Sequence, residues 1–283
     1  MVDYTDDLRL AHLLADDADS ISTDRFKALD LHVMTKPDLT PVSDADQAVE
    51  ESIRRTLAKA RTRDSITGEE EGSSGTSARR WIIDPIDGTK NFVRGVPVWA
   101  TLIALAVEDE VVMSVVSAPQ LGRRWWATKG QGSWTGKSLM KAARNQVSDV
   151  RRLEDASFAY SSLAGWEERG QLEDLLALMR RVWRTRAYGD FWSYMLLAEG
   201  AVDIAAEPEL ELYDMAALAP IVTEAGGTFT SLNGSPGPWG ANAIATNTHL
   251  YEAAMSFLGG SEEHDPDWPE PLGGTVTQLF GKD

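Results

Sequence analysis

The chain is organised around one stretch, Trp81-Ile82-Ile83-Asp84-Pro85-Ile86-Asp87-Gly88-Thr89. Its apolar start, Trp81 to Ile83, predicts a buried strand. Asp-Pro and Asp-Gly follow, and both dipeptides favour turns, so we expect the strand to end there. The carboxylates of Asp84 and Asp87 are then expected three positions apart, where the chain bends. Pro85 restricts its own backbone and that of the residue before it, which stiffens the geometry of both acids.

The end of this stretch suits an anion. Gly88 allows the backbone to approach a ligand closely, and Thr89 opens a predicted short helix whose free N–H groups can bind a phosphate. Carboxylates beside anion-binding amides make sense only if cations lie between them. The pattern therefore indicates Mg²⁺-assisted hydrolysis of a phosphate ester. The alternative is a loop that merely turns, since Asp-Pro and Asp-Gly are common in such loops.

Composition limits the class of protein. The chain has 283 residues, of which 43% are hydrophobic and 25% charged, as is ordinary for a soluble globular protein. The length fits one large domain or two smaller ones. The net charge of −17 argues against a nucleic-acid binder. It would also repel a phosphorylated substrate unless bound metal ions invert the local field.

We expect a cytoplasmic protein that does not cross a membrane. No apolar run reaches the roughly 18 residues that a membrane span needs. Residues 1–7 are acidic and lack the basic start of a signal peptide. The chain has no cysteine, so neither a disulfide framework nor a thiolate metal site is expected.

The elements before the central stretch follow from spacing and turn residues. Apolar residues at helical intervals predict an amphipathic helix over Asp6 to Arg25. Two prolines predict a loop from Lys36 to Asp46, in which Ser43 caps the next helix. Asp46 would lie in the first turn of that helix, where an acid commonly complements the helix dipole.

The remaining elements predict helices packed on sheets. A short strand from Ile66 precedes the acids Glu69 to Glu71, and residues 73–77 are predicted to form a loop. Further strands are predicted at 100–107, 111–116, 124–128 and 133–135, with their tryptophans in the core or on a sheet face. Strands and helices then alternate, at 156–160 (strand), 167–181 (helix), 182–188 (strand), 191–199 (helix), 202–206 (strand), 212–225 (helix), 228–230 and 243–245 (strands) and 249–258 (helix).

We divide the chain into an N-terminal subdomain, 1–150, that binds metal and phosphate, and a C-terminal subdomain, 151–258, that completes the site. Residues 259–283 are rich in Gly, Pro, Glu and Asp and predict a loosely ordered acidic tail. Leu279 and Phe280 could dock it.

Four acids are candidates for one metal site: Glu69, Asp84, Asp87 and Asp214. Asp214 opens a helix after an extended acidic stretch, and taken alone it fits a helix cap better than a ligand. Together the four would supply the hard oxygen ligands that Mg²⁺ prefers, with waters and substrate completing the octahedron.

At this point the sequence resembles the inositol monophosphatase family, from the first helix to about Leu258. The matching motifs stand in order and spacing; they are Gly68-Glu69-Glu70, the central stretch 81–89, Tyr213-Asp214-Met215-Ala216-Ala217 and Glu224-Ala225-Gly226-Gly227. The resemblance implies an α/β (α+β) fold, a layered α-β-α-β-α sandwich similar to fructose bisphosphatase.

The resemblance also implies roles for single residues. The metal ligands would be Glu69, Asp84, the carbonyl of Ile86, Asp87 and Asp214. Asp46, Glu69 and Thr89 would be catalytic, with Asp46 and Thr89 orienting the attacking water, and the amides of Gly88 and Thr89 would hold the phosphate. Two Mg²⁺ ions, or three, are expected per site. Inhibition by Li⁺ and a homodimer are carried over from the family.

A second motif, Arg186-Ala187-Tyr188-Gly189-Asp190-Phe191-Trp192-Ser193-Tyr194, resembles the histidinol-phosphate phosphatase branch of the family. That branch carries Gly-Asp followed by aromatic residues, and it dephosphorylates L-histidinol phosphate in histidine biosynthesis. Asp190 would recognise the cationic amine or the imidazole, helped by Asp87 and Glu207. The alternative for Asp190 is a helix N-cap, since Asp is favoured there.

Other functions remain open at this stage. An inositol-1-monophosphatase or a broad-specificity sugar-phosphate phosphatase is the main alternative. A nucleotide 3′-phosphatase would need a basic patch for a second phosphate, which the sequence does not offer. A phosphatase-like protein that binds transcription machinery would not need an intact set of acids. The expected partner is a small phosphate monoester, with no nucleic acid and no membrane.

Overall fold

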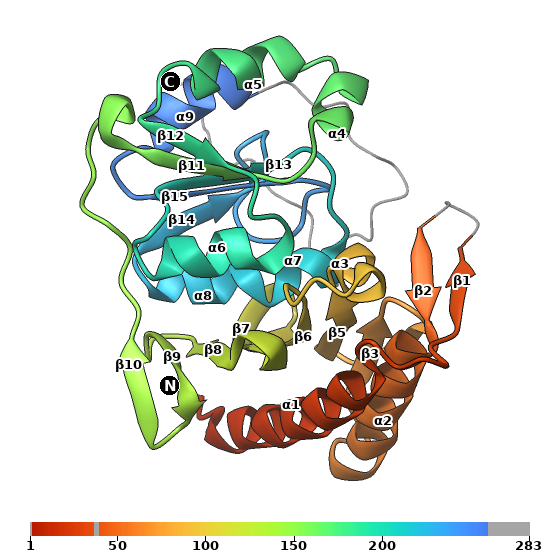
Figure 1. Ribbon diagram of the computed structural model, residues 1–283. Coiled ribbons are helices and arrows are strands. Elements are labelled where there is room, and N and C mark those ends of the chain that lie inside the picture. Colours follow the sequence, from red (N-terminus) through yellow and green to blue (C-terminus); the bar gives the residue numbers. More distant parts are fainter. Residues whose placement is uncertain (1, 37–39, 260–283) are drawn as a thin grey trace.

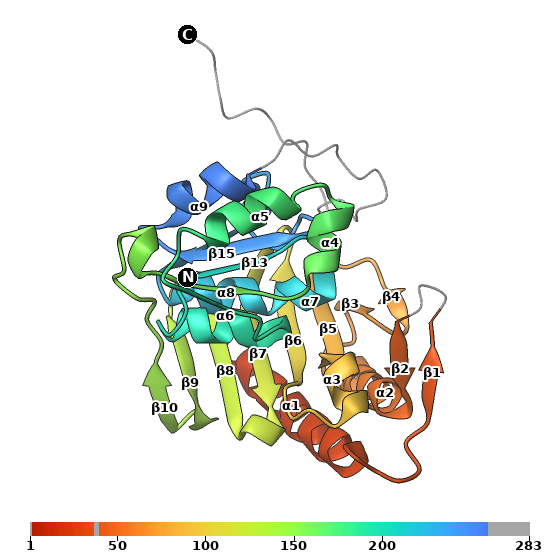
Figure 2. The same cartoon turned by 45° about the horizontal axis from the view of Figure 1, so that its top comes forward.

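The computed structural model describes residues 2–36 and 40–259 of the chain. Helices and sheets alternate in layers (Figure 1), as the resemblance implies. Helices α1 (Thr5–Arg25) and α2 (Asp44–Ala60) cover the outer face of an eight-stranded sheet. Helices α6 (Asp190–Ala198), α7 (Leu212–Ala216) and α8 (Leu218–Glu224) lie between this sheet and a five-stranded one. The tilted view shows α4 (Leu163–Glu168), α5 (Leu172–Met179) and α9 (Tyr251–Leu258) on the far side of the smaller sheet (Figure 2).

The eight-stranded sheet has the strand order β10-β9-β8-β7-β6-β5-β3-β4. Its pairs are antiparallel except for β3 with β5. The strand bounds are β3 Ser65–Gly68, β4 Gly72–Ser74, β5 Arg79–Asp87, β6 Ala100–Val107, β7 Glu110–Ala118, β8 Arg123–Thr128, β9 Ser133–Ser138 and β10 Lys141–Arg144. A 3₁₀ turn, Pro119–Leu121, joins β7 to β8.

The five-stranded sheet has the order β12-β11-β13-β15-β14. Strand β11 runs parallel to both of its neighbours, and the other pairs are antiparallel. The bounds are β11 Ser157–Tyr160, β12 Arg184–Arg186, β13 Ile204–Glu207, β14 Gly227–Thr230 and β15 Ala243–Asn247. A 3₁₀ turn, Leu153–Asp155, precedes β11.

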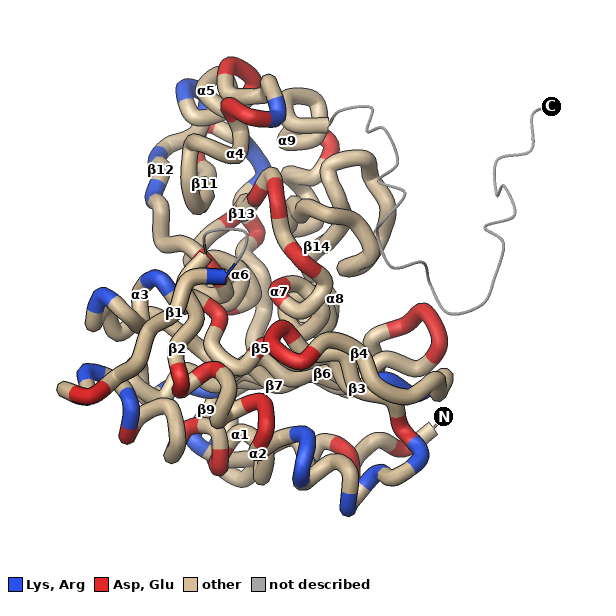
Figure 3. The backbone as a smooth tube through the Cα atoms, turned by 90° about the vertical axis from the view of Figure 1, so that its right-hand side faces the viewer, with Lys and Arg blue, Asp and Glu red and all other residues tan. Residues whose placement is uncertain are grey.

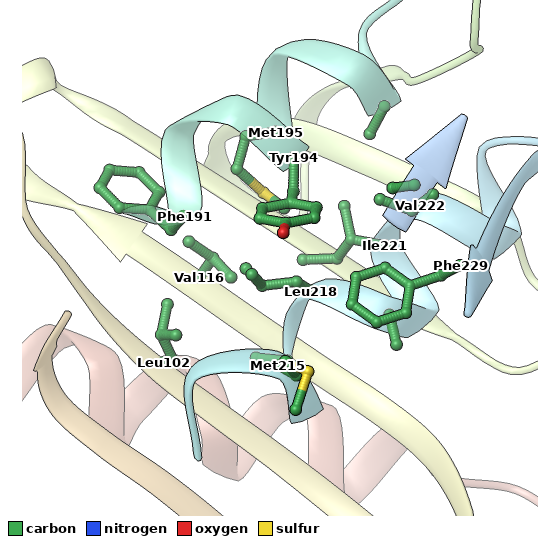
Figure 4. Close-up of a cluster of buried hydrophobic side chains, with 14 of the residues drawn as sticks. Leu102, Val116, Phe191, Tyr194, Met195, Met215, Leu218, Ile221, Val222 and Phe229 are labelled. Atoms are coloured by element: carbon green, nitrogen blue, oxygen red, sulfur yellow. The ribbon is translucent and has the colours of Figure 1, made fainter. Parts of the chain in front are cut away.

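The core between the two sheets fixes the distance between them. Leu102 and Val116 reach it from the larger sheet, and Phe229 reaches it from the smaller one (Figure 4). Tyr194 on α6 and Leu218 on α8 fill the space between. These side chains are almost completely buried. Elements from both halves of the sequence are therefore packed into one rigid block.

A small aromatic cluster supports the turn that follows β5. Phe92 lies on α3 (Thr89–Arg94), and its ring contacts those of Phe26 and Trp99 at centroid distances of 5.4 and 5.0 Å. Ile86, inside the central stretch, belongs to the same buried cluster. The turn is thus held from below by apolar packing.

Strand β5 is longer than the sequence predicts. It continues through the Asp-Pro step to Asp87, because its register against β6 shifts between Asp84 and Asp87. Pro85 cannot donate a ladder hydrogen bond, and such irregular positions tolerate proline. Its carbonyl accepts a bond from the Thr101 hydroxyl at 2.8 Å. Both acids therefore stay on the strand.

Two predicted loops contain strands. Part of the predicted loop from Lys36 to Asp46 forms β2 (Pro41–Ser43), which pairs with β1 (Val33–Thr35). Part of the predicted loop 73–77 belongs to β4, which pairs with β3. Strand β10 was not predicted. All three pairings are only three or four residues long, too short for an alternation of apolar and polar residues to mark them.

Two predicted helices are each broken in two. Gly170, with φ +72°, separates α4 from α5. The predicted helix 212–225 breaks near Ala217, between α7 and α8. Pro220 explains that break, since it has no N–H for the carbonyl four residues earlier and its ring would crowd that carbonyl. The predicted tail and its docking residues Leu279 and Phe280 lie outside the described residues.

None of the helices in segments 2–36 and 40–259 combines the length and the hydrophobicity that crossing a membrane requires. Trp125 and Trp126 are buried, as predicted for core residues.

The aromatic cluster yields a prediction about stability. Trp99 is 0% exposed, whereas Trp183 is 67% exposed and serves as a matched control. Trp99→Ala should lower the free energy of unfolding by about 3–5 kcal/mol, since a large cavity replaces the ring. Trp183→Ala should cost about 1 kcal/mol or less. Urea titrations measure both. Equal losses for the two variants would contradict the supporting role of the cluster.

Candidate active site

Gly88 makes the turn after β5. Its φ of +84° lies in the left-handed region, which favours glycine. A Cβ at this position would lie 3.0 Å from the Val98 carbonyl oxygen and 3.2 Å from Oδ2 of Asp190. The backbone is therefore packed closely against two segments, and α3 begins at the next residue, Thr89.

Three acids converge beside this turn. Asp84 and Asp87 come from β5 and Asp214 from α7, and one carboxylate oxygen of each lies within 4.8 Å of the others. Oδ2 of Asp87 accepts the Phe191 N–H at 2.7 Å, and Oδ2 of Asp214 accepts the Glu211 N–H at 2.7 Å. The Oδ1 atom of Asp84 is buried and has no hydrogen-bond partner among the described residues.

Burial raises the pKa of all three acids, and their mutual repulsion adds to this effect. The pKa of Asp214 rises to about 7, and those of Asp84 and Asp87 rise well above the ordinary value. Three carboxylates so close together cannot all be ionised cheaply without a cation. These carboxylate oxygens are hard donors, and the Oδ1 atom of Asp84 has no hydrogen-bond partner among the described residues. The group therefore fits a divalent cation such as Mg²⁺.

Glu69 stands next to this group but has a different partner. Its charge contributes to the raised pKa of Asp84, which places it near the other acids. Oε1 of Glu69 pairs with Nζ of Lys36 at 2.7 Å, and the same ammonium pairs with Glu70 at 2.8 Å. No sequence pattern assigns a role to Lys36, because it is a lone lysine after a short strand.

Asp46 has contacts that fit both sequence-based interpretations, a residue of the first helical turn and a partner of Thr89. It belongs to the first turn of α2, where Oδ2 accepts both the N–H and the hydroxyl of Ser43 at 2.8 and 2.6 Å. Its other oxygen accepts the Thr89 hydroxyl at 3.3 Å. Burial raises the pKa of Asp46 to about 6, against the effect of the Ser43 hydrogen bonds. The side chain is therefore a capping residue that also contacts Thr89.

Thr89 links the motif together. Its hydroxyl lies 3.0 Å from the Ile86 carbonyl oxygen as well as within reach of Asp46. One hydroxyl proton can serve only one acceptor at a time. The second lone pair of the Ile86 carbonyl stays available to another partner.

Asp190 faces the turn from the other half of the molecule. Its Oδ2 accepts a hydrogen bond from the Asn91 side chain at 2.9 Å. Its φ is +51°, a strained value for a residue other than glycine. Helix α6 is capped at Gly189, where no side chain bonds the helix terminus. Burial raises the pKa of Asp190 to about 6, and the neighbouring Lys90 opposes this shift.

Glu207 lies at the end of β13 and is also buried. Burial, followed by the charge of Asp190, raises its pKa to about 8. Its Oε1 atom has no hydrogen-bond partner among the described residues. Acidic positions thus gather where β5, α7 and the end of β13 meet (Figure 3).

The structure therefore brings the predicted residues from both halves of the chain to one place. Asp190 and Glu207 adjoin the acids around Asp84, since both contribute to the raised pKa of Asp87. The sequence pattern assigns no role to Asn91, although it stands only two residues after Thr89, the end of the central stretch.

Comparisons with known proteins agree on one family. Residues 4–262 match the sequence model described as the inositol monophosphatase family. A histidinol-phosphatase of Streptomyces coelicolor is 64% identical over 262 residues, which is 91% of this chain and 98% of that protein. A histidinol-phosphatase of Mycobacterium tuberculosis is 54% identical over 254 residues, 89% of this chain and 98% of that protein. The solved structure of an inositol monophosphatase from Zymomonas mobilis superposes with a TM-score of 0.80 at 32% identity, covering 91% of this chain and 99% of its own.

The close packing at Gly88 yields a second prediction. Gly72 is a matched control, because it also has a positive φ (+65°) but a Cβ there would meet nothing within 4 Å. Gly72→Ala should cost about 1–2 kcal/mol of unfolding free energy for the backbone conformation alone. Gly88→Ala should cost more, because the added methyl also meets the Val98 carbonyl. Chemical denaturation measures both losses, and a smaller loss at Gly88 would show that the turn is not constrained by its neighbours.

Proposed function

The chain belongs to the inositol monophosphatase family, and from that membership we propose that it is a Mg²⁺-dependent phosphatase of L-histidinol phosphate. The observation that supports this choice of substrate is the high sequence identity to the two histidinol-phosphatases over nearly the whole chain. The reaction would release L-histidinol and inorganic phosphate. An inositol or sugar-phosphate monophosphatase is the second candidate, favoured by the fold of the structural neighbour.

Five groups would hold the metal ions, two or three per site. They are the carboxylates of Glu69, Asp84, Asp87 and Asp214 and the carbonyl of Ile86. The orphaned Oδ1 of Asp84 and the raised pKa values of the acids support this assignment. When bound, Mg²⁺ would lower the pKa of a water and stabilise the leaving oxygen. For Glu69 to take part, its pairing with Lys36 would have to open.

The chain's own groups would orient the reactants. Asp46 accepts a hydrogen bond from the Thr89 hydroxyl, and in this arrangement the hydroxyl oxygen of Thr89 can accept a hydrogen bond from the attacking water. The water would then point one lone pair towards phosphorus. The amides of Gly88 and Thr89 would hold the phosphate oxygens, as free N–H groups at the start of a helix can.

The other end of the site would bind the leaving group. Asp190 is a half-buried acid at the start of α6, and Glu207 is a buried acid at the end of β13. A protonated amine or imidazole would compensate their charges, whereas the hydroxyl groups of an inositol would not. Asp87, which accepts the Phe191 N–H, connects the two ends.

Further properties are carried over from the resemblance and the composition. We propose a cytoplasmic homodimer that Li⁺ inhibits. The division into a metal-binding subdomain (1–150) and a completing subdomain (151–258) stays a prediction.

The metal assignment predicts opposite effects on activity and stability. Asp84→Asn should lower kcat by about a hundredfold or more, because one metal ligand loses its charge. In metal-free buffer the same variant should unfold at an equal or higher temperature than the wild type, because repulsion from Asp87 and Asp214 is relieved. Phosphate release and thermal unfolding are measured with excess chelator and then with Mg²⁺ restored. Full activity in the chelator would refute the metal-dependent reaction.

The assignment of Asp190 predicts a change in selectivity. Asp190→Asn keeps an oxygen that can accept the Asn91 hydrogen bond but removes the charge. A buried contact between a carboxylate and a cation is worth roughly 1.5–3 kcal/mol, so kcat/KM for L-histidinol phosphate should fall about ten- to a hundredfold. Glycerol 2-phosphate, which has no cationic group, should lose much less. An equal loss on the two substrates, or a lower melting temperature alone, would assign Asp190 a structural role.

A further inference from the structure

Asn91 connects two segments that meet above the turn. Its side-chain nitrogen donates to the Val98 carbonyl oxygen at 3.0 Å and to Oδ2 of Asp190 at 2.9 Å. An amide NH₂ group has two protons, so both are used. Because both partners are acceptors, the nitrogen and the oxygen of the Asn91 amide cannot be exchanged without losing both bonds.

The Val98 carbonyl gives this amide its orientation. Val98 precedes Trp99, which is completely buried in the aromatic cluster below the turn. The carbonyl is therefore attached to a rigid part of the molecule. With one N–H directed at Val98, the planar amide must direct its second N–H towards Asp190.

Asp190 is held from the opposite side by its own backbone. Gly189 and Asp190 both have positive φ values, +77° and +51°. The next N–H, that of Phe191, donates to Asp87 at 2.7 Å. Oδ2 of Asp190 is therefore fixed by Asn91, while none of the described residues donates a hydrogen bond to Oδ1.

We propose that Asn91 is a positioning residue for substrate recognition. It fixes one oxygen of the Asp190 carboxylate so that the other faces the cationic group of the leaving alcohol. This inference rests on the proposed function, because it names a group that acts through Asp190. Without Asn91, the carboxylate would rotate or turn towards the neighbouring Lys90, and the substrate would have to order it at each binding event.

A double-mutant cycle tests this coupling. The variants are Asn91→Ala, Asp190→Asn and the double variant, each assayed on L-histidinol phosphate and glycerol 2-phosphate in the presence of Mg²⁺. Asn247→Ala is the matched control, because the Asn247 side chain also donates two bonds, to Ser148 at 2.8 Å and to the Val150 carbonyl at 2.9 Å, but joins other segments. Melting temperatures accompany all assays.

We expect Asn91→Ala to raise KM for L-histidinol phosphate by about tenfold, as for a lost hydrogen bond to a charged group, with a small change in kcat. The ratio of kcat/KM values between the two substrates should fall by a similar factor. In the Asp190→Asn background the same substitution should change this ratio by less than about twofold, because the two residues act as one unit. Asn247→Ala should lower the melting temperature and leave the ratio unaltered.

Two results would overturn the proposal. The first is that Asn91→Ala changes kcat/KM for both substrates by the same factor. The second is that its effect on the substrate ratio adds fully to that of Asp190→Asn. If Asn91→Ala does not fold, Asn91→Ser retains one donor and should give an intermediate substrate ratio; an unchanged ratio would also refute the coupling. A failure of the proposed function is distinguishable, since the wild type would then show no preference for L-histidinol phosphate over glycerol 2-phosphate.

Discussion

The repulsion among three adjacent carboxylates is the constraint on which the rest of the site depends. Asp84, Asp87 and Asp214 place oxygens within 4.8 Å of one another, with Asp84 buried and the other two half-buried. Isolated, such a group would separate or take up protons. Here it is held by covalent and hydrogen-bonded geometry: two acids share one strand, and backbone N–H groups fix Asp87 and Asp214. The folded chain therefore stores an unfavourable arrangement that a cation would relieve.

This arrangement can persist because the two sheets are packed into one block. Helix α7 carries Asp214 and packs against β5 and β6, while α8 continues into the core between the sheets. Side chains such as Leu102, Leu218 and Phe229 fill that core (Figure 4). Dense apolar packing resists the small displacements that would separate the acids. The chemistry of the site thus depends on apolar contacts that never touch a substrate.

The sequence predicted what is local and missed what is distant. A few consecutive residues determine strand β5, the turn at Gly88 and the first turn of α2. The sequence pattern therefore predicts these elements. The pairs Lys36 with Glu69 and Asn91 with Asp190 are 33 and 99 residues apart, and no periodicity relates them. The family resemblance predicts that the acids form one site, but only the structure shows which residues each acid contacts. Pro220 indicates that the predicted helix 212–225 is interrupted, but the apolar residues continue past the proline and favour one continuous helix.

The charges of the site are arranged in an order that matches a substrate with two different ends. The acids around Asp84 exceed the single ammonium of Lys36 that reaches them from the described residues, so this end of the site needs additional positive charge. Asp190 and Glu207 adjoin this group, because both contribute to the raised pKa of Asp87. An anionic phosphate could bind beside these acids only if cations compensated their charge. Metal ions would supply them at one end, and the amine and imidazole of the substrate at the other. The leaving group would thereby compensate the charges of Asp190 and Glu207, which a neutral alcohol would leave without a cationic partner.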